Sequence, residues 1–178
     1  MANVLIRPAS PGDLRSIDEI YNWYIPRSTC TYQEEIEPFE NRERWFEHHG
    51  PNHPVTVAVR DAEIVGWGSL SEFRDRAAYR HTVEDSVYVR HDMHGQGIGS
   101  ALLADLIDRA RAIGHHTMIA GADAEQTASI ELHRKFGFET VAHMKEVGYK
   151  FERWLDVIFM QLMLRAANPN DETRNSNQ

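Results

Sequence analysis

The sequence lacks most features that mark secreted, membrane-spanning or nucleic-acid-binding proteins. Its 178 residues include one cysteine, Cys30, so no internal disulfide can form and a cytoplasmic location is expected. No apolar run approaches the length needed to cross a bilayer, and Met1–Arg7 lacks the apolar stretch of a signal peptide or anchor. The formal net charge of -8 argues against nucleic acid, whose phosphates are neutralised by clustered Lys and Arg.

The spacings that create metal sites are also missing. The paired histidines, His48-His49 and His115-His116, are adjacent in sequence, and adjacent residues do not share a helix face. No His-Glu-x-x-His motif or Cys-His set occurs, so no metal is expected. The length favours a single domain over residues 1–165, and the polar, aperiodic segment 166–178 is expected to be disordered.

What the chain does contain is a strand, a glycine-rich loop and a helix in succession. Val87-Tyr88-Val89 is typical of a strand, and glycines follow at positions 95, 97 and 99. Apolar residues then recur at helical spacing from Ile98 as far as Gly114. A helix that begins after such a loop presents unpaired N–H groups and the positive end of its dipole, which suits a phosphate.

Four interpretations of this loop compete. A P-loop would end in Gly-Lys-Ser/Thr, which is absent, and a dinucleotide-binding turn would need glycine where Ser100 stands. The third pattern, Arg/Gln-x-x-Gly-x-Gly/Ala, binds acyl-CoA in GNAT N-acetyltransferases, and His94-Gly95-Gln96-Gly97-Ile98-Gly99 resembles it with His in place of Arg/Gln. The fourth is a glycine-rich turn without a ligand, since a short glycine motif alone is weak evidence.

Hydrophobic periodicity predicts an α/β fold in which helices flank a mixed, mostly antiparallel central sheet. A hairpin joins two of its strands, and the end of the chain, 138–164, is strand-rich with an interrupting loop around 149–154. The other expected strands are 4–7, 55–59, 64–70, 81–89 and 117–120. The expected helices are 14–24, 41–49, 98–113 and 128–136.

Several longer motifs resemble one branch of the GNAT superfamily, the phosphinothricin and methionine sulfone (sulfoximine) N-acetyltransferases. The segment 82–89, Thr-Val-Glu-Asp-Ser-Val-Tyr-Val, is similar to that branch, as are Leu132-His133 and the Gly137-Phe138 ending. The segment 147–162 and the Asn41-Arg42 motif followed by Trp45-Phe46 also match. The resemblance covers about residues 4–164 and implies acetyl-CoA as cosubstrate.

The resemblance also implies which residues hold acetyl-CoA. Backbone groups of the strand would pair with the pantetheine amides, the N–H groups of the loop would bind the pyrophosphate, and the Val89 N–H would polarise the thioester carbonyl. Gln126 stands where the family has a CoA-contacting Asn, from which it differs by a longer side chain. The full set of predicted cofactor-binding residues is Val87, Tyr88, Val89, Gly95, Gln96, Gly97, Ile98, Gly99, Ser100 and Gln126.

Two residues are catalytic candidates by the same resemblance. Glu84 matches the branch's Glu and is the candidate general base, for which a raised pKa or a water relay would be needed. Its alternative is an ion-paired or solvated strand carboxylate. His133 replaces the Tyr that faces the CoA sulfur in most of the superfamily, so it is either an acid, a group that orients the substrate, or a histidine satisfied by a neighbour.

The acceptor is the least specified part of the prediction. The resemblance implies a small-molecule substrate, the α-amine of a small amino acid such as methionine sulfone, methionine sulfoximine or phosphinothricin. Alternatives are another amine (a protein N-terminus or a polyamine) or a CoA-binding sensor without catalysis. A homodimer is expected, as is usual in the branch. The predicted substrate-binding residues are Arg74, Arg76, Glu84, Asp85 and Ser86.

Overall fold

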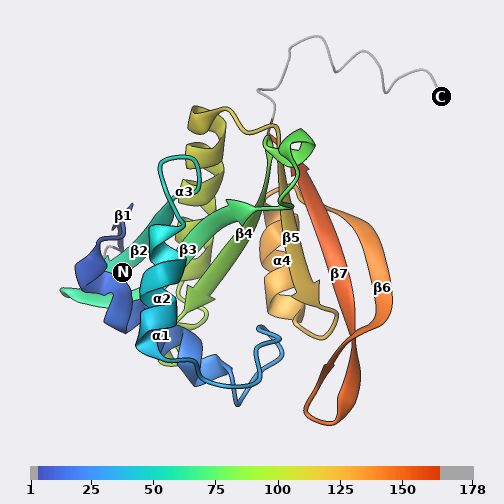
Figure 1. Cartoon of the computed structure of the whole chain (residues 1–178), viewed down its shortest axis with the longest axis horizontal. Coiled ribbons are helices and arrows are strands. Elements are labelled where there is room, and N and C mark those ends of the chain that lie inside the picture. Colours follow the sequence, from blue (N-terminus) through green and yellow to red (C-terminus); the bar gives the residue numbers. More distant parts are fainter. Residues whose placement is uncertain (1–3, 165–178) are drawn as a thin grey trace.

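The computed structural model describes residues 4–164, and the predicted domain boundary at 165 and the tail 166–178 lie outside them. Within the described residues, seven strands form one sheet in the order β1-β2-β3-β4-β5-β7-β6, and only β4 and β5 pair in parallel (Figure 1). The strands are Leu5–Pro8 (β1), Val55–Arg60 (β2), Glu63–Glu72 (β3), Thr82–Val89 (β4), Thr117–Asp123 (β5), Glu139–Lys150 (β6) and Arg153–Met163 (β7).

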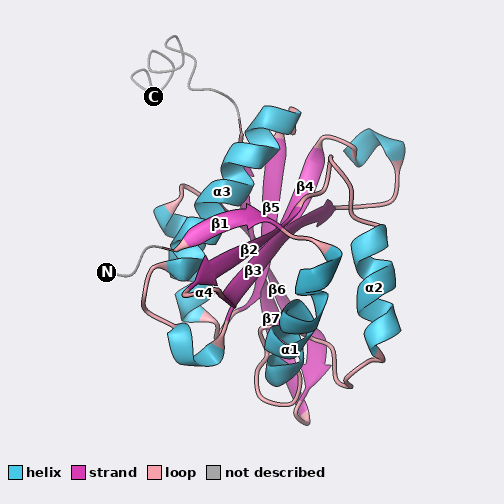
Figure 2. Ribbon diagram, turned by 90° about the vertical axis from the view of Figure 1, so that its left-hand side faces the viewer, coloured by secondary structure: helices cyan, strands magenta, loops and turns pink. Residues whose placement is uncertain are grey.

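In the part of the chain that the structure describes, four α-helices cover the sheet, α1 and α2 on one face and α3 and α4 on the other (Figure 2). They span Leu14–Tyr24 (α1), Phe39–Glu47 (α2), Ile98–Ile113 (α3) and Thr127–Lys135 (α4). Three short 3₁₀ helices, Pro11–Asp13, Ala77–Tyr79 and His91–Met93, lie in the connections. The predicted fold class is therefore confirmed.

Apolar stripes explain how the two helical layers attach to the sheet. Helix α1 buries Leu14, Ile17 and Ile20, at helical spacing, in a cluster with Trp67 of β3. Helix α3 buries Leu103 and its neighbours against the opposite face. The core is thus divided by the sheet, and residues that alternate along β3 and β4 point into different halves of it.

The C-terminal hairpin differs from the prediction at its turn. An interrupting loop was expected around 149–154, but β6 and β7 pair as far as Tyr149 with Trp154 and Lys150 with Arg153. The turn consists of Phe151 and Glu152 alone, both with positive φ (51° and 59°). Two consecutive residues in this region form the tight turn that matches strand twist, although neither is glycine. The prediction of a longer loop was therefore wrong.

Candidate active site

The site is built where the two parallel strands separate. Strand β4 pairs with β5 only over Thr82–Glu84 and Thr117–Ile119, after which the strands diverge. A cavity of about 600 Å³ lies in the gap, lined by Asp85–Val89 of β4, Ala120–Ala122 of β5 and the start of α3. We call it the splay cavity; its volume is typical of small-molecule and cofactor sites.

Strand β4 turns free backbone groups toward this gap. Arg90 donates its N–H to the Val65 carbonyl at 2.9 Å, so alternate residues of β4 bond to β3. By the same alternation, the N–H and C=O groups of Val87 and Val89, which lie beyond the last β4–β5 pair, point the other way, toward the gap. The Val89 carbonyl accepts a hydrogen bond from the Tyr24 hydroxyl at 2.6 Å, which agrees with that direction. An extended polyamide can add to such an edge as a strand would.

The glycine loop at the other end of the splay cavity opens the N-terminus of α3. Gly95 and Gly97 have φ of 73° and 82°, a region that favours glycine, and a Cβ at either position would meet nothing within 4 Å. No acidic residue occupies the first turn of α3. The loop thus leaves N–H donors accessible and uncompensated, as phosphate binding requires.

His94 and Gln126 use their side chains to shape the cavity walls. His94 Nε2 lies 2.6 Å from the Tyr24 hydroxyl, and the two rings are stacked. Gln126 donates through Nε2 to the hydroxyls of Ser28 and Thr29, at 3.3 and 3.0 Å. Since its amide is already engaged with the loop after α1, a CoA contact by Gln126 stays a prediction.

Nearly all the predicted cofactor-binding residues line the splay cavity. The exception is Gln96, whose side chain bonds to Arg60 instead. Those that line it are Val87, Tyr88, Val89, Gly95, Gly97, Ile98, Gly99, Ser100 and Gln126.

Glu84 lies at the last paired position before the strands diverge. Its register partner on β3 is Ser71, and a Cβ on Gly121 of β5 would lie 3.3 Å from Glu84 Oε1. The missing side chain at Gly121 therefore leaves room for the carboxylate. Burial and the nearby charge of Asp85 raise the pKa of Glu84, while Arg74 lowers it by less. The net shift is upward, the direction that makes a carboxylate a better base.

His133 of α4 and Asp85 of β4 form a buried pair beside the splay cavity. His133 Nε2 lies 3.0 Å from Asp85 Oδ2, and Nδ1 lies 2.7 Å from the Ser129 carbonyl oxygen. Both partners accept, so both ring nitrogens donate, as in imidazolium. Burial lowers the pKa of His133, but Asp85 and the Ser129 carbonyl together raise it by more than burial lowers it, so the net shift is upward.

Asp85 was predicted to border the acceptor together with Glu84 and Ser86. The structure places its side chain on the opposite face of β4, where it bonds to His133. Its side chain is 1% exposed, and Oδ1 has no hydrogen-bond partner among the described residues. Asp85 thus faces the cofactor side of the sheet, and its contact with a substrate stays a prediction.

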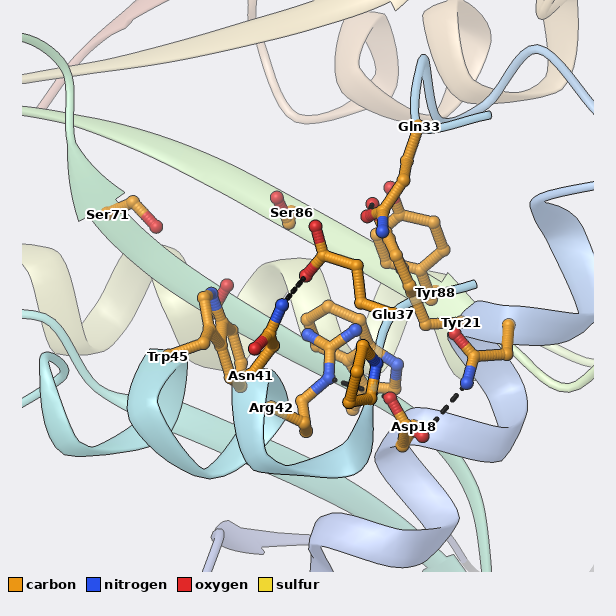
Figure 3. A pocket seen from close by; sticks show the side chains of 14 residues that line it. Asp18, Tyr21, Gln33, Glu37, Asn41, Arg42, Trp45, Ser71, Ser86 and Tyr88 are labelled. Atoms are coloured by element: carbon orange, nitrogen blue, oxygen red, sulfur yellow. Dashed lines mark hydrogen bonds and ion pairs between the residues drawn. The ribbon is translucent and has the colours of Figure 1, made fainter. Parts of the chain in front are cut away.

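A second, smaller cavity lies across β4 from the splay cavity. It measures about 210 Å³ and is enclosed by α1, α2, the loop between them and the strands β3 and β4 (Figure 3). Ser86 and Tyr88 line both cavities, so the two adjoin through β4. We call it the α2 cavity. It is lined by Asp18, Tyr21, Asn22, Gln33, Glu37, Pro38, Asn41, Arg42, Trp45, Trp67, Ser69, Ser71, Ser86 and Tyr88.

Arg74 and Arg76 lie elsewhere. Both are exposed and line a third cavity, near the C-terminal end of α3, which shares no lining residue with the other two. Arg74 is nevertheless near enough to Glu84 to lower the pKa of that carboxyl. Substrate binding by these two arginines stays a prediction.

The described part of the chain contains neither a metal-binding cluster nor a membrane-spanning helix. In residues 4–164, no cluster of three or more His, Cys, Asp or Glu side chains is arranged to hold a metal ion. Within the same residues, no helix has the length and apolar character to cross a membrane. Among the paired histidines, His115 is buried, and its Nε2 lies 2.8 Å from the Asn52 carbonyl oxygen.

Sequence reasoning missed the Asp85–His133 pair and the α2 cavity with Arg42. The alternation along β4 places Asp85 on the face of Val87, but nothing in the sequence says that α4 brings His133 there. The Asn41-Arg42 motif was noted only as a resemblance, and its amphipathic helix reads equally well as a solvated face with an apolar stripe.

Comparison with known proteins agrees with this geometry. The model of the Acetyltransferase (GNAT) family matches residues 17–138. An L-methionine sulfoximine/L-methionine sulfone acetyltransferase of Pseudomonas paraeruginosa is 44% identical over 161 residues, 89% of this chain and 94% of the relative. The L-amino acid N-acyltransferase MnaT of Escherichia coli is 41% identical over 89% of this chain and 93% of its own.

A solved structure extends the comparison to the bound cosubstrate. A phosphinothricin acetyltransferase of the GNAT superfamily from Sinorhizobium meliloti, in complex with acetyl-CoA, has a TM-score of 0.87 and 40% identity. The match covers 90% of this chain and 88% of that one. With the family model spanning more than half of the chain and relatives above 40% identity, the chain belongs to the GNAT family and is an acetyl-CoA-dependent N-acetyltransferase.

Proposed function

We propose that this enzyme acetylates the α-amine of a small amino acid that carries an oxidised sulfur or phosphorus, such as methionine sulfone, methionine sulfoximine or phosphinothricin. The single observation that carries the proposal is the meeting of the splay cavity and the α2 cavity at Ser86 and Tyr88. One cavity has the features of a CoA site, and the other has room for one small amine. The names of the relatives give the class of acceptor.

The size of the α2 cavity favours a single amino acid over a peptide. Its volume of about 210 Å³ lies below the range typical of drug-sized ligands. Its polar lining is also compatible with a charged small molecule, because Ser69, Ser71 and Ser86 line it together with aromatic residues. A long polymeric acceptor would need an open groove instead.

Acetyl-CoA, when bound, supplies the acetyl group as a thioester, and the residues of the chain perform the remaining tasks. N–H groups of Gly95–Ser100 hold the pyrophosphate, and backbone groups of Val87 and Val89 align the pantetheine. The Val89 N–H points into the gap and donates to the thioester oxygen as negative charge develops there. Positioning the thioester beside the amine is itself a large contribution to rate.

Glu84 accepts the proton that the amine loses, directly or through a water. The amine nitrogen bonds to the acetyl carbon, the carbon–sulfur bond breaks, and the sulfur leaves with its electron pair. His133 holds its protons on both nitrogens against Asp85 and Ser129, so its positive charge favours the departing thiolate. The thiolate then takes a proton from solvent.

The test is thiol release from acetyl-CoA with a panel of amines, in wild type and in Glu84→Gln. We expect turnover on methionine sulfone, and a 10²- to 10⁴-fold lower kcat in Glu84→Gln, a typical size for the loss of a general base. Glu47→Gln, an exposed glutamate at the end of α2, is the matched control and keeps full activity. Turnover on peptides alone, or undiminished activity in Glu84→Gln, would refute the proposal.

The pH dependence gives a second readout of Glu84. Protonation removes its ability to accept a proton, so kcat/KM falls as the pH drops through the pKa of Glu84. Because burial and Asp85 raise that pKa, we expect the acidic limb above the ordinary value of about 4.3 for Glu. A limb at or below the ordinary value would contradict the role of Glu84 as the base.

We further propose that two copies associate as a homodimer, in the cytoplasm. Strand β6 is one of the two edges of the sheet, and the last hairpin carries large exposed apolar side chains, which is unusual for a surface that stays solvated. Sedimentation of Trp154→Lys, at a position 61% exposed, tests this. We expect it to sediment as a monomer under conditions where wild type is a dimer. The exposed residues are Val141, Met144, Val147, Tyr149, Phe151, Trp154 and Met163.

A further inference from the structure

Arg42 stands on the wall of the α2 cavity, surrounded by aromatic rings (Figure 3). Its guanidinium carbon lies 4.6 Å from the centre of the Tyr21 ring, 4.8 Å from that of Trp45 and 5.7 Å from that of Trp67. The side chain is 11% exposed. A guanidinium held this way by three rings has few alternative positions and lies in a region of lowered dielectric.

The hydrogen-bonding capacity of Arg42 is largely unused. Its Nε donates to Asp18 Oδ1 at 3.3 Å, and neither terminal nitrogen has a hydrogen-bond partner among the described residues. Both terminal nitrogens keep some accessible surface, so a ligand in the cavity can reach them. The planar fork of the guanidinium is therefore available to a ligand with two coplanar oxygens, which is the shape of a carboxylate.

The other charges of the α2 cavity are two carboxylates. Asp18 accepts from Asn22 at 2.8 Å as well as from Arg42, so its role is to orient the guanidinium. Glu37 is exposed and accepts from Asn41 at 2.8 Å. This arrangement suits a zwitterionic amino acid. Its carboxylate is attracted to Arg42, and its ammonium group is compatible with the nearby carboxylates.

The sheet register brings this cavity next to the proposed base. Ser71 of the cavity is the direct cross-strand partner of Glu84, and Ser69 is that of Ser86. Directly opposed residues have Cβ atoms about 5 Å apart. An amino acid whose carboxylate meets Arg42 can therefore direct its α-amine toward Ser86 and Glu84, where β4 separates the two cavities.

From these contacts we propose that Arg42 binds the carboxylate of the acceptor amino acid in the α2 cavity and thereby sets the specificity for α-amino acids. The proposal rests on the proposed function. It differs from the role expected for Arg74 and Arg76, which line another cavity. The rings of Trp45 and Trp67 would hold the apolar part of the acceptor.

The test is calorimetry on the protein saturated with CoA. Methionine sulfone and its carboxamide are titrated into it in separate experiments. We expect wild type to bind the acid at least tenfold tighter than the amide, the least that a charge-assisted pair contributes. In Arg42→Gln the ratio of the two affinities should fall to about one, because the ion pair that only the carboxylate forms is gone. In Arg74→Gln the ratio should stay that of wild type.

The ratio is measured within each variant, so a general loss of stability cannot imitate the result. Arg42→Lys, which keeps the charge without the fork, is the second variant, and we expect it to give an intermediate ratio. An unchanged ratio in the Arg42 variants, loss of the ratio in Arg74→Gln, or no preference in wild type would overturn the inference.

Turnover measured on the same samples separates this inference from the proposed function. Binding that depends on Arg42 but is not followed by acetylation would refute the function and leave the carboxylate site standing. If methionine sulfone is acetylated but the ratio of the affinities for the acid and the amide is the same in wild type and the Arg42 variants, the carboxylate site is refuted and the proposed function stands.

Discussion

Gly97 offers the sharpest perturbation of the cofactor site. Its φ is 82°, and a Cβ added there would meet nothing within 4 Å, so Asp or Asn at this position costs backbone strain but no steric clash. That strain is about 1–2 kcal/mol. Gly97 is also the N-cap of α3, a position that Asp and Asn both favour, so the fold is expected to persist in both variants.

The two variants differ in charge, and that difference predicts their affinities. A carboxylate about 5 Å from two phosphate charges is repelled by about 1.7 kcal/mol at the dielectric constant of water. This corresponds to a loss of about 15-fold in affinity as a lower limit, since the splay cavity is partly shielded from solvent. Gly97→Asp should therefore bind CoA at least about 15-fold more weakly than Gly97→Asn.

Calorimetric titration with CoA measures both affinities, and urea unfolding checks that the two variants are equally folded. Raising the salt concentration should narrow the gap between them, because screening weakens the repulsion. Equal affinities for Gly97→Asp and Gly97→Asn would refute the assignment of this loop to the pyrophosphate.

Two further predictions concern stability. Because the folded pKa of His133 is raised, its imidazolium contributes stability below the unfolded pKa of about 6.5, and this contribution is lost as pH rises through the folded pKa. The difference in unfolding free energy between wild type and His133→Gln should shrink as the pH rises above the unfolded pKa, and a constant difference would contradict the charged pair. Lys150, 2% exposed, donates to the Ser28 and Thr31 carbonyls at 2.8 and 2.6 Å, so Lys150→Met should lower the unfolding free energy by about 2 kcal/mol in urea titration. No loss would mean that these contacts contribute little.

Local signals in the sequence were sufficient for most of the fold. Helix α3 lies between Gly97 and Gly114, which both have positive φ. A residue in this left-handed conformation does not continue a right-handed helix, so Gly114 (φ 96°) marks the end of α3. Alternating apolar residues marked β2, β3 and β4. The hairpin turn at Phe151–Glu152 escaped prediction because neither residue is a usual turn former, and pairing along β6 and β7 overrides that local preference.

The site was less predictable, because its parts meet only through tertiary contacts. The glycine loop and the strand before it are contiguous, so sequence reasoning could place them together. The Asp85–His133 pair joins residues of two different elements, and no spacing encodes their contact. The α2 cavity depends on how α1 and α2 pack over β3, which sets the rings that surround Arg42.

The central claim is that the splay cavity and the α2 cavity form one site joined across β4. A bisubstrate compound, in which methionine sulfone is linked through its α-nitrogen and an acetyl bridge to the CoA sulfur, tests this in one calorimetric titration. The adjoining cavities predict that it binds at least tenfold more tightly than CoA, because the second half binds without a further association cost. An affinity equal to that of CoA would contradict the account.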